Sequence, residues 1–247
     1  MSFDYSKIPL GHYDQVMRTG NPVRRAWHLQ KFERIVECIP TRPQQSILDI
    51  GCFAGSFLSF LDEEHFPRQL GVDILSDQID FAKKTYGTSF REFRHIESIN
   101  EIQKLSEKFD CVTLIEVIEH LRQDEISVLL ENISLVLKPG GSLILSTPNY
   151  FSAWPLIEIL LNYFSDINYE DQHLTKFTYF NVVRKLEKIF PSLYKKFEID
   201  IKTTTHLISP FLAFLSLEKS QQLSRLISHR TWKVPFGNLI VLKLVRK

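Results

Sequence analysis

The stretch SILDIGCFAGSFL, residues 46–58, decides the fold class of this chain. Its first five residues are mostly apolar and predict a buried strand. Gly51 follows them and predicts a turn at the end of that strand. Gly55 then opens a predicted helix over 55–65. A strand, a glycine turn and a helix in this order commonly hold a nucleotide-like ligand. Phe53 lies between the two glycines, so its side chain limits which ligand fits.

The glycine pattern disfavours a dinucleotide. The dinucleotide fingerprint needs glycines at 51, 53 and 56, but Phe53 and Ser56 occupy two of these positions. Because the second glycine admits the pyrophosphate to the backbone, NAD and FAD are disfavoured, and no GxxxxGK[ST] phosphate loop is present. Asp73 ends a predicted second strand 22 residues after Gly51, where an acidic side chain binds ribose hydroxyls. The next residue, Ile74, offers an apolar surface to a purine.

Strands and helices alternate outward from this stretch. The predicted strands are 46–50, 69–74, 90–94, 109–117 and 142–147, and the predicted helices between them are 55–65, 76–86 and 124–137. Continuous apolar strands alternating with helices predict a parallel sheet covered on both faces, which is a doubly wound α/β fold.

The flanking segments predict additions to this fold. Asn21-Pro22 marks the start of an N-terminal helix that ends before Pro40. Beyond Pro148 we expect helices at 150–164 and 178–190 and from Ser209, with strands at 197–205 and 238–247. We therefore predict an N-terminal helical segment over 1–45 and one domain over 46–247, with a helical substrate cap at about 150–180.

The composition excludes several classes of protein. The 247 residues are 44% hydrophobic, enough for one large core, and 30 Lys and Arg against 29 Asp and Glu provide no basic excess for nucleic acid. The three cysteines are far apart and show no metal-ligand spacing, so we expect no metal site. No signal peptide is expected, and the longest uncharged stretch, 141–157, is interrupted by prolines and does not predict a membrane span. We expect a cytoplasmic monomer or homodimer.

Four segments in order resemble the core motifs of class I S-adenosylmethionine-dependent methyltransferases: ILDIGCFAGSFL, LGVDILSDQIDFAKK, FDCVTLIEVIEHL and LVLKPGGSLILSTPN. The ending Glu119-His120-Leu121 is similar to that of the small-molecule group that includes the ubiquinone-biosynthesis O-methyltransferases. The resemblance covers about residues 46–149, with weaker similarity at 21–27 and 171–178. It implies a Rossmann-like sheet of seven strands with the last one antiparallel, and S-adenosylmethionine as the cofactor.

The resemblance also implies which residues bind the cofactor. The glycine loop would pass under the methionine part, Asp73 would hold the ribose, and Ile74 would flank the adenine. A residue near Glu97-Ser98 would meet the adenine edge. The full set that we expect is Asp49, Gly51, Cys52, Phe53, Gly55, Asp73, Ile74, Glu97, Ser98, Leu114 and Ile115.

The Phe53 side chain leaves open whether the glycine loop can bind the cofactor. A sulfonium ligand brings no phosphates to this loop, so a side chain is tolerated if it points away from the loop. A ring that narrows the pocket would instead indicate a chain that does not catalyse.

His120 and His173 are the candidate catalytic residues. An oxygen or nitrogen acceptor must lose a proton during methyl transfer, so a histidine near the methyl group can position or deprotonate it. His120 follows the fourth strand at the carboxyl edge of the sheet, and ordering a loop there is the favoured alternative for it. His173 lies between two added helices, where capping a loop is the alternative. Of two nearby carboxylates, we expect Glu116 to lie near the cofactor and Glu119 to pair locally.

The segment 150–180 combines apolar residues with Tyr163, Tyr169, Asp171 and His173, which suits a mostly apolar acceptor pocket. O-methylation of a small molecule is the expected activity, with S-adenosylhomocysteine as the product, and an apolar or lipid-linked acceptor would suit this segment. N-methylation of a small amine and non-catalytic binding of S-adenosylmethionine stay open as alternatives.

Overall fold

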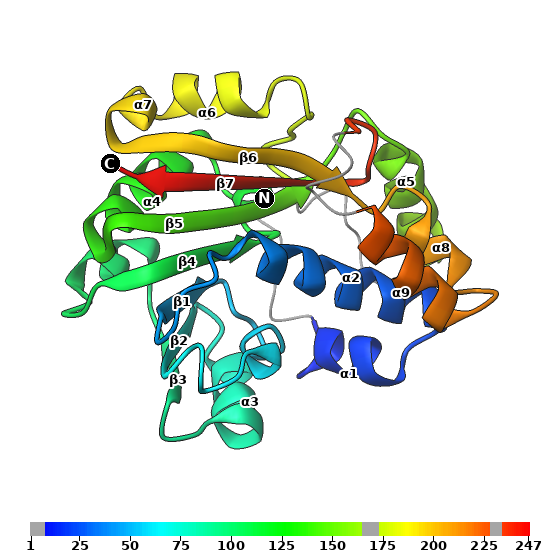
Figure 1. The fold of residues 1–247 in the computed structure, drawn as a ribbon, viewed down its shortest axis with the longest axis horizontal. Coiled ribbons are helices and arrows are strands. Elements are labelled where there is room, and N and C mark those ends of the chain that lie inside the picture. The colour runs from blue at the N-terminus through cyan, green and yellow to red at the C-terminus, as the bar shows by residue number, and fades with distance from the viewer. Residues whose placement is uncertain (1–7, 165–172, 228–233) are drawn as a thin grey trace.

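The computed structural model describes residues 8–164, 173–227 and 234–247, and it shows a sheet with helices on both faces (Figure 1). The strand order is β3-β2-β1-β4-β5-β7-β6. Neighbouring strands from β3 to β5 pair in parallel, and β7 is antiparallel to both of its neighbours, which confirms the predicted fold class. The strands are β1 (Ser46–Ile50), β2 (Arg68–Asp73), β3 (Arg91–His95), β4 (Phe109–Ile115), β5 (Leu137–Pro148), β6 (Phe197–Thr205) and β7 (Leu239–Arg246).

The helices match the predictions best where a start signal is present. The side chain of Asn21 accepts a hydrogen bond from the Arg24 N–H at 2.9 Å, so the second helix begins as predicted. The α-helices are α1 (His12–Thr19), α2 (Pro22–Cys38), α3 (Ser76–Tyr86), α4 (Gln123–Val136), α5 (Trp154–Phe164), α6 (Val182–Ile189), α7 (Leu193–Lys196), α8 (Ser209–Leu212) and α9 (Leu217–Leu226). Short 3-10 turns lie at η2 (Leu58–Phe60), η3 (Ile99–Lys104) and η4 (Ile118–His120).

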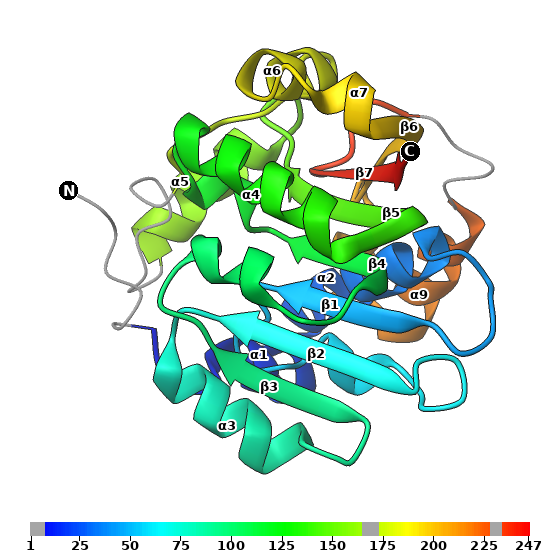
Figure 2. The same ribbon diagram turned by 90° about the vertical axis from the view of Figure 1, so that its left-hand side faces the viewer.

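Alternating residues of the central strands form two apolar layers. Leu48 and Val112 pack with α4 and α6, whereas Ile47 and Cys111 pack with α2 and α3 on the opposite face. Figure 2 shows α4 in front of the sheet and α2 behind it. None of the helices in the described part of the chain is long and apolar enough to cross a bilayer. The division of the chain at residue 46 stays a prediction.

The predicted helix at 55–65 is wrong, because only the 3-10 turn η2 forms there. Two side chains of the sheet bind carbonyl groups of this segment that a helix would need. The amide nitrogen of Gln69 donates to the Phe66 carbonyl at 3.1 Å and lies 3.3 Å from the carbonyl oxygens of Leu61 and Asp62. Arg91 donates to the Leu61 carbonyl at 2.8 Å. The long-range bond from Arg91 thus takes the Leu61 carbonyl, which a helix would bond to the His65 N–H.

We expect Gln69→Ala to lower the free energy of unfolding by about 1–3 kcal/mol, because buried carbonyl groups would lose their donor. The Gln69 side chain is fully buried, and its amide oxygen Oε1 accepts a hydrogen bond from Arg91 Nε at 2.7 Å. Urea unfolding measures the change, with the exposed Gln103→Ala as the matched control. Equal stability of the two variants would contradict this account of the segment.

Candidate functional site

The loop after β1 turns on three residues with left-handed backbone. The φ angles of Gly51, Phe53 and Gly55 are 75°, 49° and 78°. A Cβ atom on Gly51 would lie 2.6 Å from a methyl carbon of Val117, and one on Gly55 would lie 2.6 Å from the Phe93 ring. Both glycines are therefore required by close packing as well as by backbone conformation.

Asp73, at the end of β2, holds this loop in place. Its Oδ2 accepts the Phe53 N–H at 2.8 Å, and its Oδ1 accepts the Leu75 N–H at 3.0 Å. Burial raises the pKa of Asp73, and the two backbone donors oppose that rise. An ionised carboxylate offers about four acceptor positions, so Asp73 retains capacity for the hydroxyls of a ribose.

The N-terminal helix α1 covers the loop. The ring of Phe53 packs against Tyr13 with the centroids 5.1 Å apart. One carboxylate oxygen of Asp14 accepts the Ser56 hydroxyl at 2.9 Å and the Tyr86 hydroxyl at 2.7 Å. The Phe53 side chain is therefore engaged with α1, a helix that the sequence patterns did not predict.

The other predicted cofactor residues lie at the carboxyl ends of the strands, in different environments. Asp49 is buried and accepts the Thr113 hydroxyl at 2.6 Å, and burial raises its pKa to about 7, so it links β1 to β4. Ile74 is 54% exposed and available to a planar ligand. Cys52 is buried in the loop. After β3, Glu97 is exposed and Ser98 is half-buried. At the end of β4, Leu114 is buried and Ile115 is half-buried.

These residues fit a nucleoside sulfonium. The loop carries a side chain at 53, which a pyrophosphate would not tolerate, while an acidic side chain and an exposed aliphatic one stand together at the end of β2. S-adenosylmethionine needs this combination, since it supplies a ribose and an adenine without phosphates. When bound, it supplies the reactive methyl group.

Glu116 directly follows β4 and has a left-handed backbone, at φ 54°. Its carboxylate forms an ion pair with the Lys31 ammonium from α2. Burial alone would raise the pKa of Glu116, but the charge of Lys31 and its hydrogen bond, together with two nearby histidines, lower the pKa. Glu116 is therefore a paired carboxylate beside the methionine end that the resemblance implies.

Immediately after it, Glu119 and His120 meet His173, which comes from a distant part of the chain. The Thr175 N–H donates to the Glu119 carbonyl at 3.0 Å, and the Thr175 hydroxyl donates to the Leu121 carbonyl at 2.8 Å. These two bonds hold the returning segment against η4, and the His120 and His173 ring centroids lie 5.1 Å apart. The structure thus brings together the two predicted catalytic histidines.

His173 is oriented by a buried carboxylate. Its Nδ1 lies 2.7 Å from Glu158 Oε1 and 2.7 Å from the Tyr150 hydroxyl, which itself donates to Glu158 at 2.8 Å. Burial would raise the pKa of Glu158, but the hydrogen bonds from His173 and Tyr150 and the charge of Lys176 together lower the pKa. With Nδ1 engaged, Nε2 is the ring nitrogen that His173 presents to the cluster. The sequence analysis missed Tyr150 and Glu158, which lie in an apolar segment.

Glu119 is only 1% exposed, and neither of its carboxylate oxygens makes a hydrogen bond with the residues that the structure describes. Burial raises the pKa of Glu119 well above its usual value, and the charge of Glu116 adds to the rise. The Thr147 hydroxyl opposes this rise without cancelling it, and among the described residues the expected local pairing of Glu119 goes no further than this contact. A buried carboxylate of this kind is costly unless a cation or donor offsets it.

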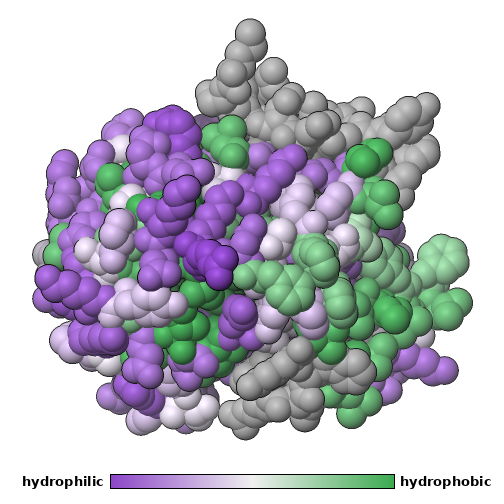
Figure 3. Space-filling model, turned by 90° about the horizontal axis from the view of Figure 1, so that it is seen from above, coloured by the Kyte–Doolittle hydropathy of each residue, from purple (hydrophilic) through white to green (hydrophobic). Residues whose placement is uncertain are grey.

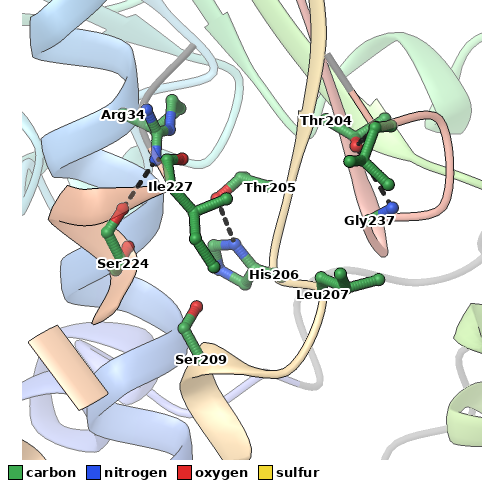
Figure 4. A pocket seen from close by; sticks show the side chains of 10 residues that line it. Arg34, Thr204, Thr205, His206, Leu207, Ser209, Ser224, Ile227 and Gly237 are labelled. Atoms are coloured by element: carbon green, nitrogen blue, oxygen red, sulfur yellow. Dashed lines mark hydrogen bonds between the residues drawn. The ribbon is translucent and has the colours of Figure 1, made fainter. Parts of the chain in front are cut away.

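A small pocket lies away from the predicted site, where α2, α9 and the end of β6 pack together (Figure 4). Arg34 of α2 lines it and donates to the carbonyl groups of Ser224 and Ile227 at 3.0 and 2.7 Å, at the end of α9. None of the predicted site residues lines it. Of the polar residues predicted for the acceptor pocket, Tyr169 and Asp171 and the side chain of Tyr163 lie outside what the structure describes.

Comparison with known proteins identifies the family. The sequence model of a methyltransferase domain matches residues 24–190. The chain belongs to this methyltransferase family. It is a class I S-adenosylmethionine-dependent methyltransferase, and S-adenosylmethionine is its cofactor.

Individual relatives share about half of their length with this methyltransferase. A ubiquinone biosynthesis O-methyltransferase of Coxiella burnetii is 29% identical over 130 residues, 52% of this chain and 51% of that protein. The chain spans about half the length of the first curated relatives that it matches. At 17% identity, the PH0226 protein of Pyrococcus horikoshii superposes over the whole of both chains with a TM-score of 0.63, which shows the fold. The magnesium protoporphyrin IX methyltransferase of Synechocystis, with bound S-adenosylhomocysteine, is 16% identical, covers 95% of this chain and 98% of its own, and has a TM-score of 0.58.

We expect Asp73→Ala to weaken the binding of S-adenosylhomocysteine by about 1.5–3 kcal/mol, because the ribose would lose hydrogen bonds to a charged group. Calorimetric titration measures the affinity. Asp80→Ala, which removes an exposed carboxylate of α3, is the matched control and should bind like the wild type. Unchanged affinity in a folded Asp73→Ala variant would exclude Asp73 as the ribose ligand.

Phe53→Gly and Phe53→Ala form a matched pair. Both lose the contact with Tyr13, but only glycine removes the cost of a left-handed backbone, so we expect Phe53→Gly to be more stable than Phe53→Ala by about 1 kcal/mol in urea unfolding. Because the ring packs against α1, both variants should retain the wild-type affinity for S-adenosylhomocysteine. Binding that appears only when the ring is removed would show instead that Phe53 blocks the pocket.

Proposed function

We propose that this methyltransferase transfers the methyl group of S-adenosylmethionine to a hydroxyl oxygen of a small molecule and releases S-adenosylhomocysteine. The observation that carries this proposal is the cluster of a half-buried His120 with the buried Glu119 and His173, next to the end of β4. Since the cofactor supplies the reactive group, the protein must position the acceptor and manage its proton. A neutral amine already has a free lone pair, whereas a hydroxyl becomes a strong nucleophile only when it loses its proton. The cluster suits the hydroxyl.

The name of a curated relative also supports O-methylation. The Coxiella burnetii protein is named an O-methyltransferase, and its similarity spans about half of each chain. In our proposal Asp73 and Ile74 hold the nucleoside, and the end of β4 holds the methionine part. The methyl group then faces η4, where the histidines lie.

The surface beside the histidines suits an apolar acceptor. Phe151 directly follows Tyr150, which contacts His173. The ring of Phe151 lies 4.9 Å from that of Phe180 and 6.0 Å from that of Phe236, and all three rings are at least half exposed. Figure 3 shows that hydrophobic residues gather on one side of the molecule. We therefore propose an aromatic or otherwise apolar alcohol or phenol as the acceptor, with a few polar groups orienting it.

The direct experiment supplies S-adenosylmethionine with matched pairs of acceptors, each a phenol and the aniline of the same skeleton. Release of S-adenosylhomocysteine and a product that carries one additional CH2 by mass spectrometry report the transfer. We expect methylation of the phenol. Methylation of the aniline alone would replace the proposal with N-methylation, and tight binding of the cofactor without any product would favour the non-catalytic alternative.

We expect His173→Ala and His120→Ala each to lower turnover by about 10²-fold or more, because each removes a group that prepares the acceptor. The affinity for S-adenosylhomocysteine should stay unchanged, since the cofactor contacts lie on β1, β2 and β4. His65→Ala is the matched control, because His65 is exposed and pairs only locally with Asp62. Full turnover in both variants would remove the histidines from the mechanism.

A further inference from the structure

Four aromatic side chains from separate parts of the chain meet around Trp27 of α2. The centroid of the Trp27 ring lies 5.6 Å from that of Trp154, at the start of α5. It also lies 4.4 Å from the His206 ring, after β6, and 6.4 Å from the Phe211 ring of α8. These four side chains are called the aromatic wall below.

We propose that the aromatic wall binds the ring of the acceptor, and that the buried indole N–H of Trp154 donates a hydrogen bond to the oxygen that is methylated. This inference rests on the proposed function, because it concerns the acceptor of the same reaction. It adds the place where the acceptor ring binds and the side chain that selects an oxygen on that ring.

The indole N–H of Trp154 is a buried donor without an acceptor. Trp154 is 6% exposed, and its Nε1 makes no hydrogen bond with any residue that the structure describes. The N–H is near the Tyr150 hydroxyl, since it opposes the rise in the pKa of Tyr150 that burial and Glu158 cause. That hydroxyl donates its own proton to Glu158 at 2.8 Å. A buried donor of this kind is costly unless a ligand or water accepts from it.

Trp154 also brings this donor next to His173. The centroids of the two rings lie 6.2 Å apart. Because Nδ1 of His173 is engaged with Glu158, Nε2 is the nitrogen that can take the proton of a hydroxyl. An oxygen bound between His173 and Trp154 loses its proton to the imidazole and accepts a hydrogen bond from the indole. The indole N–H then stabilises the negative charge that develops on this oxygen.

The methyl transfer itself then needs no further group from the aromatic wall. The oxygen attacks the methyl carbon of S-adenosylmethionine, so that a new C–O bond forms as the bond from sulfur to the methyl group breaks. The electron pair of the broken bond stays on the sulfur of S-adenosylhomocysteine, and the proton of the hydroxyl stays on His173 until water removes it.

His206 fixes the Trp27 ring in place. His206 is 1% exposed and has a left-handed backbone, at φ 65°, which is unfavourable for a residue with a Cβ atom. Since a carbonyl group only accepts, His206 Nε2 donates to the Trp27 carbonyl, at 2.7 Å, and the two rings meet edge to face. Burial lowers the pKa of His206 to about 4, so its ring is neutral at physiological pH. The fold thus maintains a strained residue that holds an uncharged surface rigid.

The aromatic wall adjoins the proposed cofactor site. Trp27 and Lys31 are one helical turn apart, so they point to the same side of α2. Lys31 pairs with Glu116, which directly follows β4, where the methionine part of the cofactor is expected. At its outer edge Phe211 is 41% exposed, whereas Trp154 is buried. A ligand can therefore reach the aromatic wall at Phe211 and direct its oxygen to the buried end.

These properties select the chemical class of the acceptor. Uncharged rings bind another ring by offset stacking or edge-to-face contacts, which an aliphatic alcohol cannot make. The single buried donor requires an oxygen on that ring. A wall that served only as core would have no use for an indole N–H at this position, because a phenylalanine would fill it without a buried polar group. The aromatic wall therefore favours an aromatic hydroxyl.

The test measures the binding of 2-naphthol and of naphthalene to the complex of the full chain with S-adenosylhomocysteine, in which no methyl transfer occurs. The two probes share one ring system, and only 2-naphthol carries an oxygen. We expect Trp154→Phe to weaken the binding of 2-naphthol about 10-fold, because the donor is lost, and that of naphthalene by about 2-fold at most.

Two variants of the neighbouring tryptophan are the controls. Trp27→Phe makes the same change of ring without removing the Trp154 donor, so both probes should bind within about 2-fold of the wild type. Trp27→Leu removes the ring and should weaken both probes by a similar factor, about 5-fold. Circular dichroism establishes that each variant is folded.

Equal effects of Trp154→Phe on the two probes would overturn the hydrogen bond to the acceptor oxygen. Failure of the wild-type complex to bind 2-naphthol, or unchanged binding of both probes by Trp27→Leu, would overturn the aromatic wall as the acceptor site. The wild-type complex decides the question even if Trp154→Phe does not fold, because 2-naphthol must bind to it more tightly than naphthalene does.

Turnover separates this inference from the proposed function. Methylation of 2-naphthol with kcat/KM lowered about 10-fold by Trp154→Phe, at unchanged affinity for S-adenosylhomocysteine, supports both. Wild-type kcat/KM in Trp154→Phe would overturn the part of Trp154 and leave the proposed function intact. Preferential binding of 2-naphthol that Trp154→Phe abolishes, without methylation of any hydroxyl, would instead support the acceptor site and contradict the proposed function.

Discussion

The contact of the Asp73 carboxylate with the backbone of the glycine loop is the constraint on which the cofactor site depends. Phe53 has a left-handed backbone, which is costly for a residue with a Cβ atom, and its N–H donates to Asp73 at 2.8 Å. The same carboxylate accepts the Leu75 N–H, so one buried side chain fixes both the loop after β1 and the chain after β2. The loop at the proposed nucleoside site is thereby fixed between the two strands, and α1 covers this loop through Tyr13 and Asp14.

The fold was predictable from sequence wherever a local signal and the tertiary packing agreed. Helix α3 occupies the predicted residues, and α2 begins at Asn21-Pro22 because a side-chain cap and a proline specify that start. The segment 55–65 has a helical pattern but forms only η2, and Arg91 binds its Leu61 carbonyl from the sheet. Helices α1 and α9 were not predicted, because the residues that they bury, Asp14 and Met17 in α1 and Ser220 and Ser224 in α9, are mostly polar.

The candidate site was predictable as a set of residues but not as an arrangement. His120 follows a strand and His173 lies in a polar segment, and both features are visible in the sequence. Their contact depends on the hydrogen bonds from Thr175 to η4, which join segments more than 50 residues apart. Glu158 lies in an apolar stretch, where its carboxylate had no apparent purpose until the fold placed it against His173. Local patterns carry no information on such pairings.

Glu116 and Glu119 show how neighbouring carboxylates acquire different roles. Both follow β4 within a few residues, yet the Lys31 ammonium pairs with the first, and the second is buried without a donor among the described residues. Lys31 comes from α2, so the helix that covers the sheet also neutralises the first carboxylate. Lys31 thus accounts for the opposite pKa directions of two carboxylates that burial affects alike: the pKa of Glu116 is lowered, and the pKa of Glu119 is raised.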